Sequence, residues 1–172
     1  MSRCTMRIFT VLLVALVLIP LTANAAPISI ISEDYNKYGC PGDYPFTEDN
    51  LKLVVQDGNV VLAERSFCSS YGKASALIEQ DALGAYFVLL RYGQGRGTNA
   101  RSEYLAVYKL DHNLIEYIRI PISAPASGAS RWEYKYKISK PQAGGLLFHL
   151  VLEVEPKAEW YPAEKLRIIE IR

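Results

Sequence analysis

The fold of this chain is decided by residues 132–138, which read WEYKYKI. Every second residue is large and apolar, and the residues between them are charged: Glu133, Lys135 and Lys137. Successive side chains of a strand point to opposite faces of a sheet, whereas side chains on one face of a helix recur about every 3.6 residues. The alternation therefore predicts a strand with one face on a hydrophobic core and the other in water.

Further strands are expected on both sides of this segment, because short apolar runs alternate with turn residues. Asp57-Gly58-Asn59 and Asp111-His112-Asn113 are expected to form tight turns, since such residues tolerate the positive φ that short hairpins require. The expected strands lie at residues 28–32, 51–56, 60–65, 85–92, 102–110, 114–122, 132–138, 146–155 and 165–171.

Residues 70–84 allow two interpretations. One is a helix capped by Ser70 and ended by Gly84. The other is a strand over residues 75–80 followed by a tight turn over residues 81–84. We favour the strand because it continues the hairpin pattern of the rest of the chain.

The sequence as a whole predicts an all-β protein, an antiparallel meander of about eight strands that forms a barrel or a sandwich. Its connections are too short for the crossover helices of parallel βαβ units. With 172 residues, 50% hydrophobic and 22% charged, the chain is too balanced for a disordered tail, a collagen or a coiled coil. A net charge of +1 provides no excess to neutralise phosphates, so we expect no nucleic-acid partner.

The first 25 residues are expected to be a secretory signal peptide. Arg3 and Arg7 precede an apolar run over residues 8–19, and Ala23-Asn24-Ala25 follows it. The run is shorter than the roughly 20 residues that a membrane-spanning helix needs, which argues against the alternative of a retained anchor. We therefore expect a single all-β domain over residues 26–172, in the periplasm or secreted, with no stable membrane insertion after cleavage.

Cleavage after residue 25 removes Cys4 and leaves Cys40 and Cys68. Two cysteines in an oxidising compartment predict one disulfide between them. The alternative, a metal-binding or redox pair, lacks both a Cys-x-x-Cys spacing and a nearby histidine. We expect no cofactor and no metal.

The sequence offers little for catalysis. His112 falls on an expected hairpin tip and is interpreted as a solvated turn residue, while His149 is interpreted as a half-buried strand residue with a partner across the sheet. No nucleophile elbow and no metalloprotease helix motif is present. Carboxylates for glycosidase-type chemistry occur before residue 51, namely Glu33, Asp34, Asp43, Glu48 and Asp49.

Two segments are candidate recognition loops. Residues 93–101 read GQGRGTNAR, and the glycines of this Gly/Arg loop would allow unusual backbone conformations with free amide groups. Arg96 and Arg101, with Asn99 between them, suit an acidic partner; the alternative is an ordinary mobile hairpin loop. Residues 35–46 form the second candidate, with three tyrosines of the kind that recognition surfaces use: Tyr35, Tyr38 and Tyr44.

The sequence is therefore interpreted as an exported, non-enzymatic binding module. It would act as an inhibitor or toxin-neutralising (immunity-type) protein that presents the Gly/Arg loop to a partner protein with an acidic surface or cleft. One alternative is a barrel that binds an apolar or sugar ligand among Trp132, Tyr134 and Tyr136. Another is a carboxylate-dependent enzyme acting on envelope polysaccharide.

Overall fold

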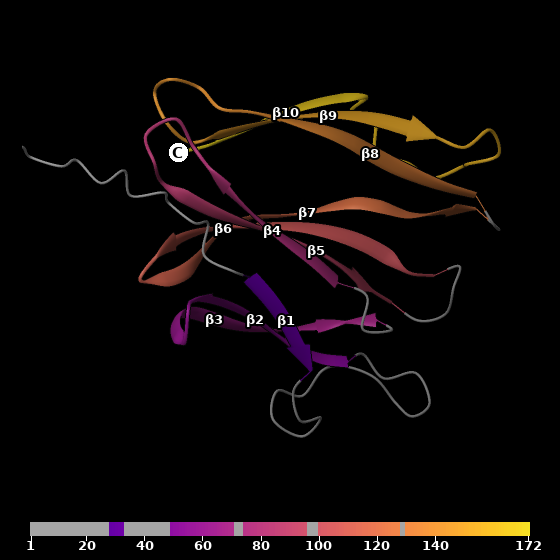
Figure 1. Ribbon diagram of the computed structural model, residues 1–172. Helices are drawn as coiled ribbons and strands as arrows, with labels where there is room; N and C mark the ends of the chain where they lie inside the picture. The colour runs from indigo at the N-terminus through magenta and orange to yellow at the C-terminus, as the bar shows by residue number, and fades with distance from the viewer. Residues whose placement is uncertain (1–27, 33–48, 71–73, 96–99, 128–129) are drawn as a thin grey trace, which may run out of the picture.

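The computed structural model describes residues 28–32, 49–70, 74–95, 100–127 and 130–172 (Figure 1). These residues form ten strands and no α-helix, which confirms the all-β prediction. The strands are β1 (Ile28–Ser32), β2 (Asp49–Asp57), β3 (Val60–Ser69), β4 (Ala74–Gln80), β5 (Tyr86–Gln94), β6 (Ser102–Asp111), β7 (Asn113–Ser127), β8 (Ser130–Ser139), β9 (Leu146–Val154) and β10 (Leu166–Ile171). Among the described residues, no helix has the length and apolar character needed to cross a membrane.

The strands form two antiparallel sheets. The smaller sheet has the order β1-β2-β3, and the larger has the order β10-β9-β8-β7-β6-β5-β4. Within the described residues β4 and β10 are the two edges of the larger sheet and do not pair with each other, so this sheet is not closed into a barrel. Of the two predicted architectures, the arrangement fits a sandwich.

Three layers of strands are visible in Figure 1, with β8–β10 at the top, β4–β7 in the middle and β1–β3 at the bottom. The middle layer has a hydrophobic core on each face. Phe87 and Leu89 of β5 lie in the core shared with β8–β10, whereas Val88 and Leu90 lie in the core shared with the smaller sheet. A strand buried on both faces needs no polar alternation, which explains the nearly continuous apolar run of β5.

The larger sheet changes layer along β7. This long strand pairs with most of β6, but it pairs with β8 only through residues 123–127. Pro121 and Pro125 have no backbone N–H for a sheet ladder, and the pairing with β6 is interrupted between Glu103 and Tyr104. These features let β8–β10 turn back over the middle layer and bury the apolar face that the WEYKYKI alternation predicts.

Residues 74–80 form strand β4 and residues 81–84 form a turn, so the strand interpretation is confirmed and the helix alternative is wrong. Asp81 organises this turn: its Oδ1 accepts the N–H groups of Leu83 at 2.9 Å and Ala85 at 2.8 Å. Its Oδ2 accepts the N–H of Gly145, in the turn between β8 and β9, at 2.6 Å. The bond from Gly145 is the main reason that the pKa of the Asp81 carboxyl lies below its usual value.

The two predicted tight turns are also confirmed. Gly58 has a φ of 56° between β2 and β3, and His112 has a φ of 55° between β6 and β7. β2 and β3 extend beyond the expected limits, to residues 49–57 and 60–69. These extra residues carry β3 to the same end of the molecule as the end of β5.

The three aromatic residues considered for an interior ligand lie in the upper core instead. Trp132 and Tyr134 pack edge to face with ring centroids 5.8 Å apart, and Tyr136 lies 6.2 Å from Phe148. The hydroxyl of Tyr134 donates a hydrogen bond to the carbonyl of Glu164 at 2.7 Å. These rings therefore belong to the core that β8–β10 share with the middle layer, where Trp132 and Tyr134 are buried and Tyr136 packs against them.

Candidate binding site at the ends of β5 and β6

The base of the Gly/Arg loop is described, while Arg96 and Asn99 lie outside the described residues. Gly95 has a φ of 109°, and a Cβ there would lie 2.5 Å from the carbonyl oxygen of Ala100. A Cβ on Gly93 would collide with the guanidinium of Arg101. Both glycines are therefore explained by close packing at the base of the hairpin, and Arg101 lies directly over Gly93.

Side chains from other strands hold this base. Ser70 donates its hydroxyl proton to the carbonyl of Gly95 at 2.7 Å, and the buried hydroxyl oxygen of Ser69 accepts a backbone N–H of β5 at 3.3 Å. Arg131 of β8 donates through Nη2 to the carbonyl of Arg101 at 2.7 Å. The strand ends that carry the loop are thus fixed from two sides, by β3 and by β8.

A charged cluster lies beside the base. Arg91 donates through Nε at 2.9 Å and Nη2 at 2.5 Å to one oxygen of Glu103, and its Nη2 lies 3.5 Å from Glu133. Arg101 contacts the other oxygen of Glu103 at 3.4 Å. Burial by itself would raise the pKa of Glu103, but the hydrogen bond and charge of Arg91, together with Arg101, outweigh burial and hold that pKa below its usual value. Glu103 is therefore an anion that two arginines share.

A cavity of about 300 Å³ opens at this cluster. Arg91, Glu103 and Arg101 contribute to its wall, and the complete set of described lining residues is Ala74, Ser75, Arg91, Tyr92, Arg101 and Glu103. The Nε of Arg101 is buried and has no hydrogen-bond acceptor among the described residues. A buried donor without an acceptor costs about 1–3 kcal/mol and is rare in native proteins.

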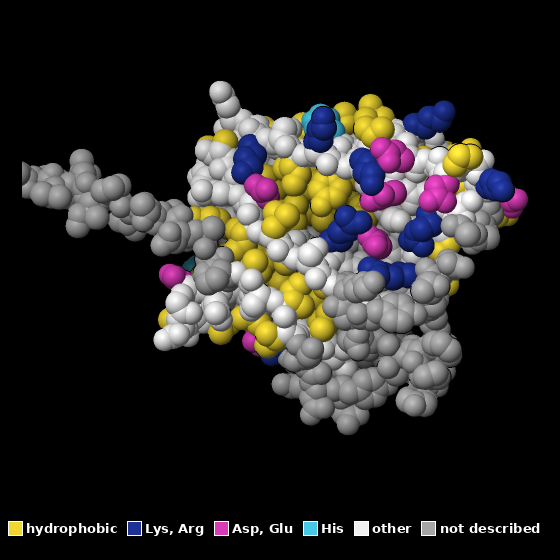
Figure 2. Space-filling model, turned by 45° about the vertical axis from the view of Figure 1, so that its right-hand side comes forward, with side chains coloured by type: hydrophobic (Ala, Val, Ile, Leu, Met, Phe, Trp, Pro, Cys, Tyr) yellow, Lys and Arg dark blue, Asp and Glu magenta, His cyan; other side chains and the backbone are white. Residues whose placement is uncertain are grey.

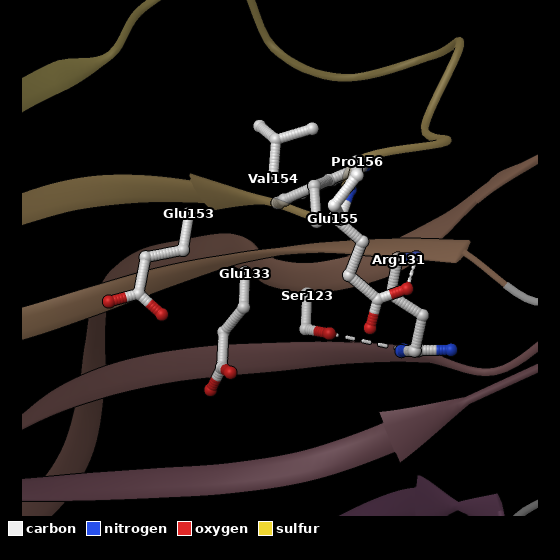
Figure 3. A pocket seen from close by; sticks show the side chains of 8 residues that line it. Ser123, Arg131, Glu133, Glu153, Val154, Glu155 and Pro156 are labelled. Carbon is white, nitrogen blue, oxygen red and sulfur yellow. Dashed lines mark hydrogen bonds between the residues drawn. The ribbon is translucent and has the colours of Figure 1, made fainter.

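A second cavity, of about 370 Å³, is lined in part by Arg131 and Ser123 (Figure 3). Arg131 donates to the hydroxyl of Ser123 at 3.1 Å, and its backbone N–H donates to Glu155 at 2.9 Å. Figure 3 shows the carboxylates of Glu133 and Glu153 extending from adjacent strands, where the two residues are register partners. Like charges in that arrangement destabilise a sheet.

Lysine and arginine side chains are interspersed with acidic ones on the side of the molecule that Figure 2 brings forward. Among the described ion pairs, the ammonium of Lys135 contacts Glu133 at 2.5 Å. The charges of these side chains are therefore compensated locally over much of this face. A donor that lacks an acceptor, as at Arg101, is the exception.

The second candidate loop cannot be placed, because Tyr35, Tyr38 and Tyr44 lie outside the described residues. Cys68 is half-buried near the end of β3. Cys40 lies outside the described residues, so its pairing with Cys68 stays a prediction.

The histidines behave as expected. His112 is exposed at the β6–β7 turn, with its Nε2 3.8 Å from Asp111. His149 is half-buried on β9, and its Nε2 lies 3.4 Å from the hydroxyl of Ser139 on the adjacent strand. Of the five candidate carboxylates Asp49 begins β2, and the others, Glu33, Asp34, Asp43 and Glu48, lie outside the described residues. In the described part of the chain, no group of three or more His, Cys, Asp or Glu residues is arranged to hold a metal ion.

Sequence reasoning missed Arg91, Glu103 and Arg131, which connect the loop base to the neighbouring strands. Arg91 carried a usable signal, because it is a charged residue in the otherwise apolar run of β5. The periodicity of β5 places it on the face of Phe87 and Leu89, but its partner Glu103 follows only from the pairing of β5 with β6.

Comparison with known proteins identifies no relative: no family model, no curated protein and no solved structure matches the chain.

Proposed function

We propose that this protein is an exported, non-enzymatic binding module that inhibits or neutralises a partner protein by receiving an acidic group of that partner at the base of the Gly/Arg loop. The observation that carries the proposal is the guanidinium of Arg101, which lines a cavity and whose Nη2 makes only a long, 3.4 Å contact with Glu103. A carboxylate of the partner, entering the cavity, would accept the N–H donors of Arg101 that Glu103 leaves unused.

The chemistry of the site supports this choice of ligand. Guanidinium groups bind carboxylates through short, charge-assisted hydrogen bonds, and their planar fork gives directional specificity. Glu103 occupies only part of the hydrogen-bonding capacity of Arg101, through Nη2. Arg96 and Asn99, in the loop itself, would add contacts around the same acidic group.

The rigidity of the base supports a recognition role. Ser70 and Arg131 fix the carbonyls of Gly95 and Arg101, so the loop starts and ends at defined points. A preorganised binding segment loses less conformational entropy when it binds, which favours affinity. The proposal needs no nucleophile, base or metal from this chain.

A site-specific crosslinking experiment tests the proposal. A photoreactive amino acid is placed at Thr98 in the loop or, as a control, at Val60 in the distant β2–β3 turn, and the protein is expressed with export. We expect a single adduct from Thr98 and none from Val60. The double substitution Arg96→Glu, Arg101→Glu is expected to reduce the yield of that adduct by about tenfold or more, because truncating a buried charged contact typically costs about 2–5 kcal/mol.

Two further variants separate recognition from folding. Gly93→Ala is expected to displace the Arg101 guanidinium and reduce the adduct while the native fold is retained, because only the end of a flexible side chain must move. Arg172→Glu, at the exposed C-terminus, serves as the matched charge control. Equal crosslinking by the double variant and the native sequence would refute the role assigned to the loop.

A further inference from the structure

A third cavity lies on the opposite face of β5 and β6 from the charged cluster, between the two sheets. Its volume is about 230 Å³. Tyr92 of β5 and Tyr108 of β6 point into the face that the smaller sheet covers, as expected from their alternation with Arg91 and Val107. The described residues that line the cavity are Arg65, Ser66, Phe67, Cys68, Tyr92, Gln94, Tyr108 and Arg119.

The charges at this cavity are not balanced. Arg65 of β3 and Arg119 of β7 both contact a single carboxylate oxygen of Glu116, at 3.4 Å and 2.9 Å. No aspartate or glutamate is among the described lining residues, whereas both arginines are. Two guanidiniums that share one carboxylate oxygen retain several N–H donors, and with side chains 42% and 45% exposed they remain accessible to a ligand.

The remaining wall is aromatic. Phe67 packs edge to face on Tyr92 with ring centroids 5.6 Å apart, and the guanidinium carbon of Arg65 lies 5.4 Å from the ring centroid of Tyr108. Burial raises the pKa of Tyr92 to about 12 and also raises the pKa of Tyr108. Both hydroxyls therefore stay protonated at neutral pH, as hydrogen-bond donors need to be.

We infer that this cavity binds a small organic anion that carries an aromatic ring, of the chemical class of the aromatic carboxylates. The carboxylate would pair with Arg119 and Arg65, and the ring would pack against the half-buried Phe67. Drug-sized ligands occupy cavities of about 300–1,000 Å³, so the smaller volume here fits a ligand of about ten non-hydrogen atoms. This site does not depend on the Gly/Arg loop, and its test is independent of the proposed partner.

Titration of the isotope-labelled protein with benzoate, followed by amide chemical shifts, tests the inference. We expect saturable chemical-shift changes centred on the amides of Phe67, Tyr92 and Tyr108. Because the probe is small, its Kd should lie roughly between high-micromolar and low-millimolar concentrations. Acetate, which lacks the ring, and benzylamine, which reverses the charge, are expected to bind at least about tenfold more weakly. Absence of saturation, shifts centred elsewhere, or equal binding of either control compound would overturn the inference.

Substitutions at the arginines give a second measurement. Arg119→Gln is expected to weaken benzoate binding about tenfold or more, because it removes the charge-assisted bond, whereas Arg167→Gln on the distant strand β10 should leave the Kd within about twofold. If Arg119→Gln does not fold, Arg65→Gln takes its place. An unchanged Kd in the folded variant contradicts the assignment of the arginines.

Discussion

Asp81 joins two turns that lie far apart in the sequence, and its replacement tests whether that connection stabilises the sandwich. The carboxylate accepts three backbone N–H groups, from Leu83 and Ala85 in its own turn and from Gly145 in the β8–β9 turn. Hydrogen bonds to a charged group contribute about 1.5–3 kcal/mol each, but they are not additive within one network. Asp81→Ala is therefore expected to lower the free energy of unfolding by about 3 kcal/mol and the Tm by about 6–12 °C.

The pH dependence gives this prediction a sharper form. Because the pKa of Asp81 is lowered in the folded state, its stabilisation is complete above the unfolded-state pKa and is lost as the pH falls through the folded-state pKa. Asp81→Asn keeps the local turn acceptor but places an amide where Oδ2 meets the N–H of Gly145. The stability gap between this variant and the native protein should be full at pH 7 and should shrink below about pH 4.

Urea denaturation of the native protein, Asp81→Ala and Asp81→Asn at several pH values between 7 and 3 measures these differences. Titration of other carboxylates, such as Glu103, affects all three proteins alike and cancels in the comparison. The reasoning is refuted if Asp81→Ala costs less than about 1 kcal/mol, since even one lost charged hydrogen bond should exceed that. A gap between Asp81→Asn and the native protein that stays constant down to pH 3 would also refute it.

Three further predictions concern the backbone, the cysteines and the N-terminus. Gly145→Ala should destabilise the fold by more than about 2 kcal/mol in thermal denaturation. The positive φ of Gly145 is strained for alanine, and the new Cβ would collide with the carbonyl oxygen of Ile171, the last residue of β10. Gly58→Ala is the control: its Cβ would meet nothing within 4 Å, so it should cost only about 1 kcal/mol. Cys40→Ser should cost about 3–4 kcal/mol if Cys40 pairs with Cys68, and a peptide map under non-reducing conditions that lacks this crosslink would exclude the pairing. N-terminal sequencing of the exported protein should begin at Ala26, and any other start would move the predicted cleavage site.

Much of the secondary structure followed from local sequence, for reasons that the structure makes clear. The turns at Gly58 and His112 are set by residues that tolerate positive φ, and the alternation over residues 132–138 produces a strand wherever one face of it is buried. The segment 70–84 was ambiguous because alanine, leucine and glutamate suit either a helix or an edge strand. Residues 74–80 form a strand because they pair with β5. This pairing cannot be read from the local sequence pattern.

The candidate site was only partly predictable. Arg101 was named from the Gly/Arg composition of its loop, but the sequence suggested that the neighbouring glycines free the backbone for a ligand. In the structure Gly93 instead makes room for the Arg101 guanidinium. Arg91 and Glu103 are 12 residues apart and meet only because β5 and β6 pair.

The sequence by itself determined that this chain folds into short antiparallel strands joined by tight turns, because side-chain periodicity and backbone preferences act between near neighbours. Tertiary structure alone decided that the larger sheet stays open and turns back on itself at β7 to give two cores. It also decided which guanidiniums share a carboxylate, as Arg65 and Arg119 share that of Glu116. The same contacts decide which guanidiniums keep unused N–H donors, as Arg101 does. Those outcomes depend on contacts between strands distant in the sequence, whose energies are set by burial and by the geometry of the whole sheet.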